Sequence, residues 1–166
     1  MSQAASRPAA APAVDIRIES PLWQAQPEAE ATIRAAIAAT AAFANRDGEV
    51  SVLLTDDAEI TRLNRDWRGL DKPTNVLSFP APETGAGNLM GDIVLAYETL
   101  ARECETEDGL FLHHLAHLAA HGFLHLIGYD HQTDSQADEM EGLESQIMLR
   151  LNMPDPYRAR ERDLSI

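Results

Sequence analysis

The feature that most constrains this chain is a run of three histidines around one glycine, HGFLHLIGYDH, at residues 121–131. His121 and His125 are four residues apart, so on an α-helix they point the same way, about 6 Å apart along the axis. Gly128 can adopt the left-handed conformation that ends a helix, and the turn after it can return His131 to the same point. Three neutral imidazoles that converge can hold a zinc ion and leave a fourth coordination position open.

The segment therefore predicts a helix that ends in a three-histidine metal site made by His121, His125 and His131, with one Zn2+ per chain. Such a set of imidazoles would also accept nickel, copper or cobalt. The alternative is that the histidines are ordinary core or surface residues with satisfied hydrogen bonds.

The same spacing occurs in the metzincin metalloproteases, which carry a glutamate directly after the first histidine as their general base. The corresponding residue here is Gly122. A peptidase of that type would lack its base, so we expect similar ligand geometry but different chemistry. A zinc ion on three histidines can lower the pKa of a bound water towards 7 or polarise a phosphoryl oxygen, and the sequence does not choose between these roles.

Together with two upstream segments, this stretch resembles the YbeY family of bacterial endoribonucleases. The matching segments are HGFLHLIGYDH (121–131), RGLDKPTNVLSFP (68–80) and GDI (91–93), and the resemblance extends from about residue 14 to about residue 153. It implies a zinc-dependent endoribonuclease, specific for single strands, that acts in rRNA maturation at the 3′ end of the small-subunit rRNA and in ribosome quality control.

The resemblance also places the functional arginine of the family at Arg68. Its guanidinium would clamp a phosphate or stabilise the charge that builds up in the transition state. Without the resemblance, Arg68 is a basic residue near a helix C-terminus, where it would neutralise the helix dipole. Four neighbours in the same segment could line the cleft, although Asn75 and Ser78 could instead satisfy backbone groups at a strand end: Lys72, Thr74, Asn75 and Ser78.

Two residues beside the histidine ligands leave alternatives open. His117 lies one turn before His121, and could be a hydrogen-bond partner of a ligand, a proton shuttle, or a core or surface residue. Asp130 could orient a ligand imidazole or cap the turn. The general base is therefore open among His117, Asp130, the substrate phosphate and bulk water, and the nucleophile is either water or the RNA 2′-hydroxyl.

Length and composition are those of one soluble domain. The 166 residues suffice for a core, and 45% are hydrophobic. The single cysteine, Cys104, cannot form an intrachain disulfide, and no apolar run reaches the roughly 18 residues of a membrane span. Residues 1–13 lack the apolar core of a signal peptide. We expect a disordered lead at 1–13, one metal-binding domain at 14–153, a charged tail at 154–166 and a cytoplasmic location.

Apolar periodicity predicts both strands and helices. Four strands are expected at 14–19, 50–55, 75–79 and 91–97, the last two as an antiparallel hairpin. Helices are expected from Pro27, from a cap at Asp56 or Asp57 to Gly69, at 98–104, at 110–127, and from a Thr133/Gln136 capping box to about Leu151. The pattern predicts a single α+β domain, with a four-stranded mixed sheet, about five helices and the histidine helix at the centre.

The periodicity also predicts where particular side chains lie. In the second helix, Ile60, Leu63 and Trp67 fall on one face and are expected in the core. His113 and His114 are expected to be exposed.

The net charge of −14 argues against RNA binding through bulk charge. An RNA enzyme would need a local basic patch or a protein partner. The expected partners are an rRNA precursor and the ribosome or its proteins, with no membrane and no DNA. The alternative function is a zinc-stabilised ribosome assembly or binding factor without nuclease turnover, whose acidic surface would dock on a basic ribosomal protein. Gly122 argues against a third function, that of a metallopeptidase-like hydrolase.

Overall fold

The computed structural model describes residues 11–82, 88–107 and 110–157. Its strands are β1 (Ala13–Ile18), β2 (Glu49–Thr55), β3 (Val76–Pro80) and β4 (Leu89–Ala96). Its helices are α1 (Ala29–Ala44), α2 (Asp57–Arg68), α3 (Tyr97–Glu107), α4 (Phe111–Leu126) and α5 (Asp134–Arg150), and a 3-10 helix, η2, covers Pro21–Ala25.

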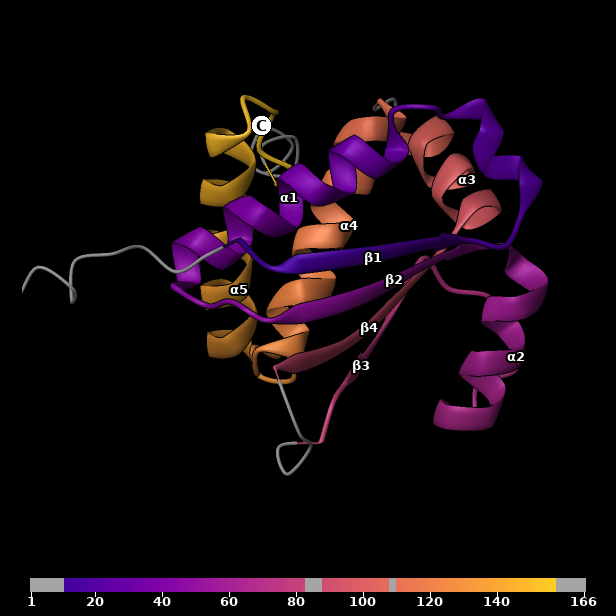
Figure 1. Ribbon diagram of the computed structural model, residues 1–166, viewed down its shortest axis with the longest axis horizontal. Helices are drawn as coiled ribbons and strands as arrows, with labels where there is room; N and C mark the ends of the chain where they lie inside the picture. The colour runs from indigo at the N-terminus through magenta and orange to yellow at the C-terminus, as the bar shows by residue number, and fades with distance from the viewer. Residues whose placement is uncertain (1–10, 83–87, 108–109, 158–166) are drawn as a thin grey trace, which may run out of the picture.

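The four strands form one mixed sheet in the order β1-β2-β4-β3 (Figure 1). β1, β2 and β4 run parallel, and β3 pairs antiparallel with β4 as the hairpin pattern predicts. The α+β fold with a four-stranded mixed sheet is therefore confirmed. β3 is an edge strand of the sheet, so one side of its backbone is left for other parts of the chain or for a ligand.

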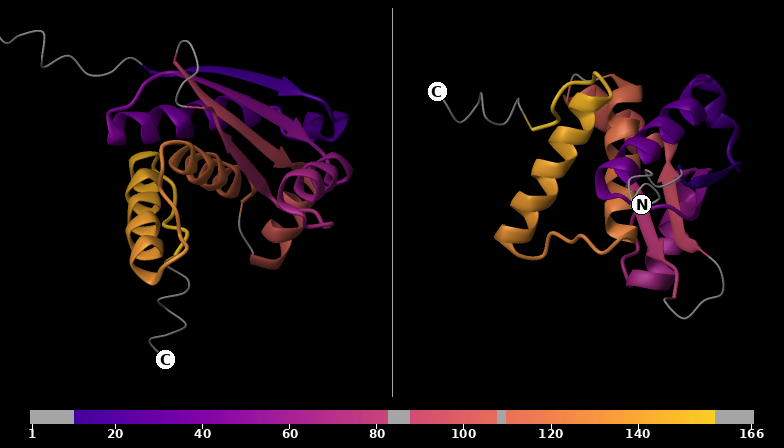
Figure 2. Two further views of the ribbon diagram at one scale, coloured as in Figure 1. Left: turned by 90° about the horizontal axis from the view of Figure 1, so that it is seen from below. Right: turned by 60° about the vertical axis from the view of Figure 1, so that its left-hand side comes forward.

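Alternate residues of the strands face two different helical layers. Val52 of β2 and Ile93 of β4 belong to the main core, which α1 and α4 complete with Ile37 and Phe123. The alternate residues of the strands, such as Val94, point to the opposite face of the sheet and contact α2. Figures 1 and 2 show α4 lying between the sheet and α5, so the histidine helix is central, as predicted.

Local signals account for the ends of several elements. Asp56 caps α2 by accepting a hydrogen bond from the backbone N–H of Glu59, and Gly69 ends the helix with φ of 72°. The Thr133/Gln136 capping box at the start of α5 is present with both of its hydrogen bonds. The structure differs from prediction at smaller points: η2 was not expected, α1 begins two residues after Pro27, and α3 continues to Glu107.

The prediction that Trp67 lies in the core is wrong, because its side chain is 71% exposed. α2 meets the sheet through its earlier turns, where Ile60 and Asn64 are buried. At Trp67, in the last turn, the ring makes an edge contact with Phe79 at a centroid distance of 6.0 Å. A helical period predicts which residues share a face, but not how far along the helix the sheet extends.

Parts of the expected termini, residues 1–10 of the lead and 158–166 of the tail, lie outside the described residues. Within the described part of the chain, none of the helices has the length and apolarity needed to cross a membrane.

Candidate metal centre

α4 approaches the sheet closely because Gly122 has no side chain. A Cβ atom at this position would lie 3.0 Å from Cγ2 of Ile93 and 3.2 Å from Oγ of Ser78. That Ser78 hydroxyl donates a hydrogen bond to the backbone carbonyl of Gly122 at 3.1 Å. Gly122, the residue after the first histidine, therefore faces β3 and β4 and not solvent. This contact holds the part of α4 that carries His121 against the sheet.

The turn after α4 brings the third histidine back. Gly128 has φ of 105°, its N–H donates to the carbonyl of His125, and the N–H of Tyr129 donates to the carbonyl of Leu124. This pair of bonds is the Schellman pattern that a glycine after the helix end permits. Asp130 then accepts a hydrogen bond from the backbone N–H of His131 at 2.8 Å, so its carboxylate caps the turn.

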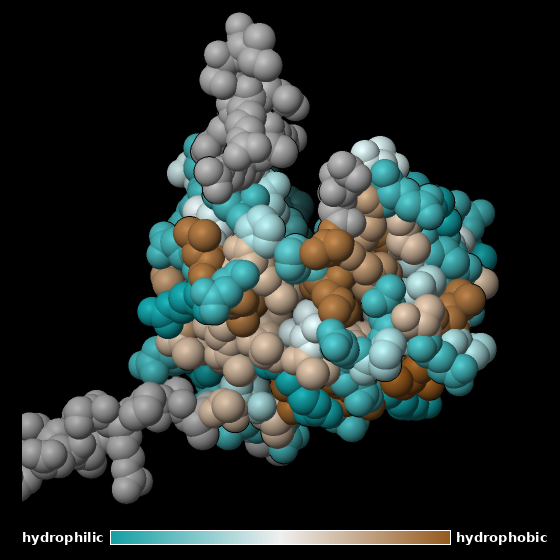
Figure 3. Space-filling view, turned by 90° about the horizontal axis from the view of Figure 1, so that it is seen from above, coloured by the Kyte–Doolittle hydropathy of each residue, from teal (hydrophilic) through white to brown (hydrophobic). Residues whose placement is uncertain are grey.

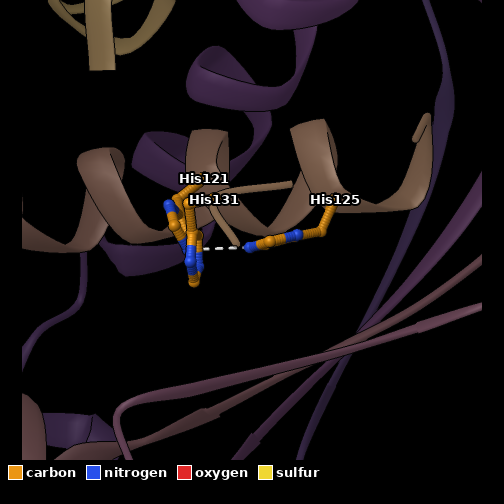
Figure 4. Close-up of side chains that lie close together, drawn as sticks. All are labelled: His121, His125 and His131. Atoms are coloured by element: carbon orange, nitrogen blue, oxygen red, sulfur yellow. Dashed lines mark hydrogen bonds between the residues drawn. The ribbon is translucent and has the colours of Figure 1, made fainter. Parts of the chain in front are cut away.

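The three imidazoles converge as the sequence predicts (Figure 4). One ring nitrogen from each of His121, His125 and His131 lies within 4.8 Å of the others. Nε2 of His121 and Nε2 of His125 are 3.1 Å apart. Two nitrogen ligands of a tetrahedral zinc ion are separated by about 3.3 Å, given Zn–N bonds of about 2.05 Å. The donor set and its spacing therefore fit a metal ion, with His131 completing a triangle of ligands.

A buried carboxylate lies behind this triangle. Glu144 of α5 has a side chain that is 1% exposed, and both of its oxygens lie 3.4 Å from Nδ1 of His121. Burial would raise the pKa of Glu144, but hydrogen bonds from His117 and His121 outweigh it and lower the pKa to about 2. Glu144 is therefore ionised at neutral pH and is placed to accept the Nδ1 proton of His121, which leaves Nε2 for a metal.

His125 is kept neutral by its surroundings. Burial is the largest cause, and the neighbouring His121 and His131 add to it, so the pKa of His125 lies below its usual value. A hydrogen bond with the backbone of Tyr129 partly opposes this shift. A neutral imidazole is the form that binds a metal, so the site favours the ligand-competent state.

A cleft of about 660 Å3 opens in front of the histidines. Its other wall is β3 with the segment before it, including Thr74, Asn75 and Ser78, and Arg68 also lines it. Lys72, the fourth candidate from that segment, is not among the lining residues. Arg68 ends α2, which packs on the opposite face of the sheet, so it approaches the cleft at the free edge of β3.

Within the described part of the chain, Arg68 has no carboxylate at ion-pair distance. In contrast, Arg65 on the same helix lies 3.3 Å from Asp66 and 3.8 Å from Asp71. The guanidinium of Arg68 is thus available to an anion in the cleft.

Polar contacts fix two further groups. The amide of Asn75 donates to both carboxylate oxygens of Glu103, at 3.0 and 3.2 Å, and Glu103 also lies 2.7 Å from Nε2 of His114. His114 is therefore paired, and both it and His113 are half-buried, contrary to the expectation that they are exposed. His117 contacts Glu144 through Nε2 and does not line the cleft, so it is a hydrogen-bond partner of the carboxylate behind His121.

Sequence reasoning missed Glu144, Glu103 and Tyr157. Glu144 had a detectable signal, because it follows Met140 by four residues and precedes Ile147 by three, on the buried stripe of α5. A charged residue on such a stripe requires a partner, and the histidine helix was the nearest source. Glu103 and Tyr157 had no comparable local signal.

Comparisons with known proteins show which family this chain belongs to. Residues 16–152 match the family profile described as Endoribonuclease YbeY. Relatives named Endoribonuclease YbeY include one from a Bradyrhizobium species, 52% identical, covering 91% of this chain and 95% of the relative. One from Nitrobacter winogradskyi is 53% identical, covering 92% and 86% respectively. A solution structure from Thermotoga maritima is 25% identical, covers 84% of this chain and 91% of that one, and superposes with a TM-score of 0.47. The family match over most of the chain and the identity to these relatives show that the chain belongs to the endoribonuclease YbeY family.

Proposed function

We propose that this protein is a zinc-dependent endoribonuclease that cleaves single-stranded RNA, with one zinc ion held by His121, His125 and His131. The observation that supports it most is the meeting of three imidazoles and the guanidinium of Arg68 on one cleft. The names of the relatives support RNA as the substrate. When bound, the zinc ion would supply a water of lowered pKa and a Lewis acid for a phosphoryl oxygen.

The chain's own residues would hold and orient the phosphodiester. Arg68 would clamp the phosphate and stabilise the negative charge that grows on it. Ser78 donates its hydroxyl proton to the carbonyl of Gly122, so it shapes the wall and is already engaged. The side-chain NH2 group of Asn75 donates to Glu103, which leaves the side-chain oxygen of Asn75 as an acceptor at the cleft.

Of the two side chains considered as general base, Asp130 is the better placed. Asp130 lines the cleft beside His131. Its Oδ1 accepts a hydrogen bond from the backbone N–H of His131, and its other oxygen is left to accept a proton. His117 does not line the cleft, and its Nε2 is bound to Glu144. We therefore assign any protein-supplied base to Asp130, with the substrate phosphate and bulk water as the other sources.

In the cell, we propose a cytoplasmic role in rRNA maturation, at the 3′ end of the small-subunit rRNA, and in ribosome quality control. The partners would be precursor rRNA and ribosomal proteins. The net charge of −14 favours delivery of RNA by a basic protein partner over capture of free RNA.

The decisive experiment pairs two arginines of α2. Arg68→Gln should lower kcat/KM on a single-stranded RNA about 100-fold or more, because it removes a transition-state contact, while zinc content and fold are retained. Arg65→Gln is the matched control, because it removes another exposed arginine of the same helix, one that pairs with Asp66 and lies outside the cleft.

His125→Ala should lose both zinc and cleavage. Wild-type protein that holds zinc but cuts no RNA after removal of contaminating nucleases would overturn the enzyme proposal. That result would favour the alternative of a zinc-stabilised ribosome assembly factor.

A further inference from the structure

We propose that Tyr157, acting with His117, is a positioning residue that holds Glu144 against His121 and so sets the affinity of the metal centre. The segment after α5, with Asp155 and Tyr157, would thus contribute to metal binding. This inference rests on the zinc site proposed above, but not on RNA cleavage. It extends the centre from three ligands in one stretch of sequence to groups from α4, α5 and the chain beyond.

Three side chains, those of His117, His121 and Tyr157, contact the carboxylate of Glu144. Oε1 accepts hydrogen bonds from Nε2 of His117 and, at 2.9 Å, from the hydroxyl of Tyr157. Oε1 and Oε2 each lie 3.4 Å from Nδ1 of His121. A carboxylate with a 1% exposed side chain needs such partners, because water cannot solvate it there.

Tyr157 is itself held in a defined place. Oδ1 of Asp155 accepts hydrogen bonds from the hydroxyl of Ser145 at 2.8 Å and from the backbone N–H of Tyr157 at 2.9 Å. The first of these anchors the segment to α5, one residue after Glu144 in the sequence. The ring of Tyr157 then packs edge-on against His117 with centroids 5.6 Å apart. The hydroxyl is therefore directed at Glu144 by the segment and by the ring contact.

The arrangement has a specific consequence for His121. A carboxylate opposite Nδ1 keeps the proton on that nitrogen, so the lone pair is on Nε2, which faces Nε2 of His125. If Tyr157 or His117 released Glu144, the carboxylate could rotate away and His121 would lose both its tautomer and its orientation. Glu144 does not line the cleft, so it cannot act on the substrate directly.

The test measures zinc affinity by competition with a chelator of known affinity, and the absorption spectrum of the Co2+-substituted protein. Tyr157→Phe keeps the ring on His117 and removes one hydroxyl. It should weaken zinc binding several-fold, up to about tenfold, and Glu144→Gln should weaken it about 10- to 100-fold. Both should alter the Co2+ spectrum. Tyr97→Phe is the matched control, because it removes the hydroxyl of a ring that packs against Trp23 and Phe111 in the core.

A purely structural role would give a different result. Tyr157 and Glu144 would then only fasten the last segment and α5 to α4, so both variants would lower the stability of the metal-free protein in urea denaturation. Unchanged zinc affinity and an unchanged Co2+ spectrum in folded Tyr157→Phe would overturn the proposal. Because zinc binding is the readout, the test keeps its meaning even if the wild-type protein cleaves no RNA.

Discussion

At the scale of single residues, Gly122 shows how packing and chemistry constrain each other. The metzincin proteases place their catalytic glutamate at the equivalent position. Here that position is buried between α4 and the sheet, and even a Cβ would be 3.0 Å from the side chain of Ile93. The absence of the glutamate is thus tied to the way α4 packs against the sheet, and the cleft must obtain its base elsewhere.

We expect Gly122→Glu to destabilise the protein by about 3 kcal/mol or more, because it forces a large charged side chain into a filled space. The measurement is the free energy of unfolding in urea. Gly142→Glu is the control: Gly142 lies on the exposed side of α5, where an added Cβ would meet nothing within 4 Å, so its replacement should be neutral or slightly stabilising. A stable Gly122→Glu protein that hydrolysed peptides would contradict the packing argument.

At the scale of elements, the two ends of α2 have different roles: the first half packs on the sheet and the last turn is exposed. Ile60 in its first half is fully buried against Leu77 and Val94 of the sheet. Trp67 and Arg68 in its last turn are exposed, beyond the part that the sheet covers. The first half therefore fixes the helix in place, and the last turn is left to present Arg68 to the cleft.

This division predicts unequal effects on stability. Ile60→Ala should cost about 2–5 kcal/mol, because it leaves a cavity in the core. Trp67→Ala should cost less than about 1 kcal/mol, since a mostly exposed ring is lost with one aromatic contact. Denaturation curves of the two variants provide the comparison. A loss at Trp67 as large as that at Ile60 would mean that α2 packs along its whole length.

At the scale of the whole molecule, a strongly acidic protein has to bind a polyanion. The net charge is −14, with 13 basic and 27 acidic residues. On the face shown in Figure 3, hydrophobic residues gather in groups among hydrophilic ones. At the proposed site, RNA contacts would therefore depend on local groups such as Arg68 and a metal ion held by the histidines, not on a broad electrostatic field.

Binding of single-stranded RNA should then depend only weakly on salt. One arginine–phosphate contact gives a slope of about 0.7 in log Kd against log salt, so the Kd should rise about threefold or less between about 50 and 200 mM salt. The measurement is the affinity for a 2′-O-methyl oligonucleotide, which lacks the free 2′-hydroxyl. Arg68→Gln should remove most of this dependence of log Kd on log salt. A slope several times steeper would mean that RNA binds a broader basic surface than the cleft with Arg68.

Local sequence alone determined much of this protein. Helical spacing gave the His121–His125 pair, and glycine chemistry at Gly128 gave the turn that returns His131. The capping box and the β3–β4 hairpin follow from patterns within about 20 residues, where periodicity and turn preference act directly.

Tertiary structure decided what surrounds the three histidines. Glu144 meets His121 across 23 residues of sequence, and Tyr157 meets His117 across 40. Arg68 lines the same cleft as the histidines only because α2 and β3 meet at the edge of the sheet. Trp67 is exposed because the sheet ends before the helix does, which no periodicity encodes. Such contacts depend on where whole elements pack, so they are properties of the assembled fold and not of any one segment.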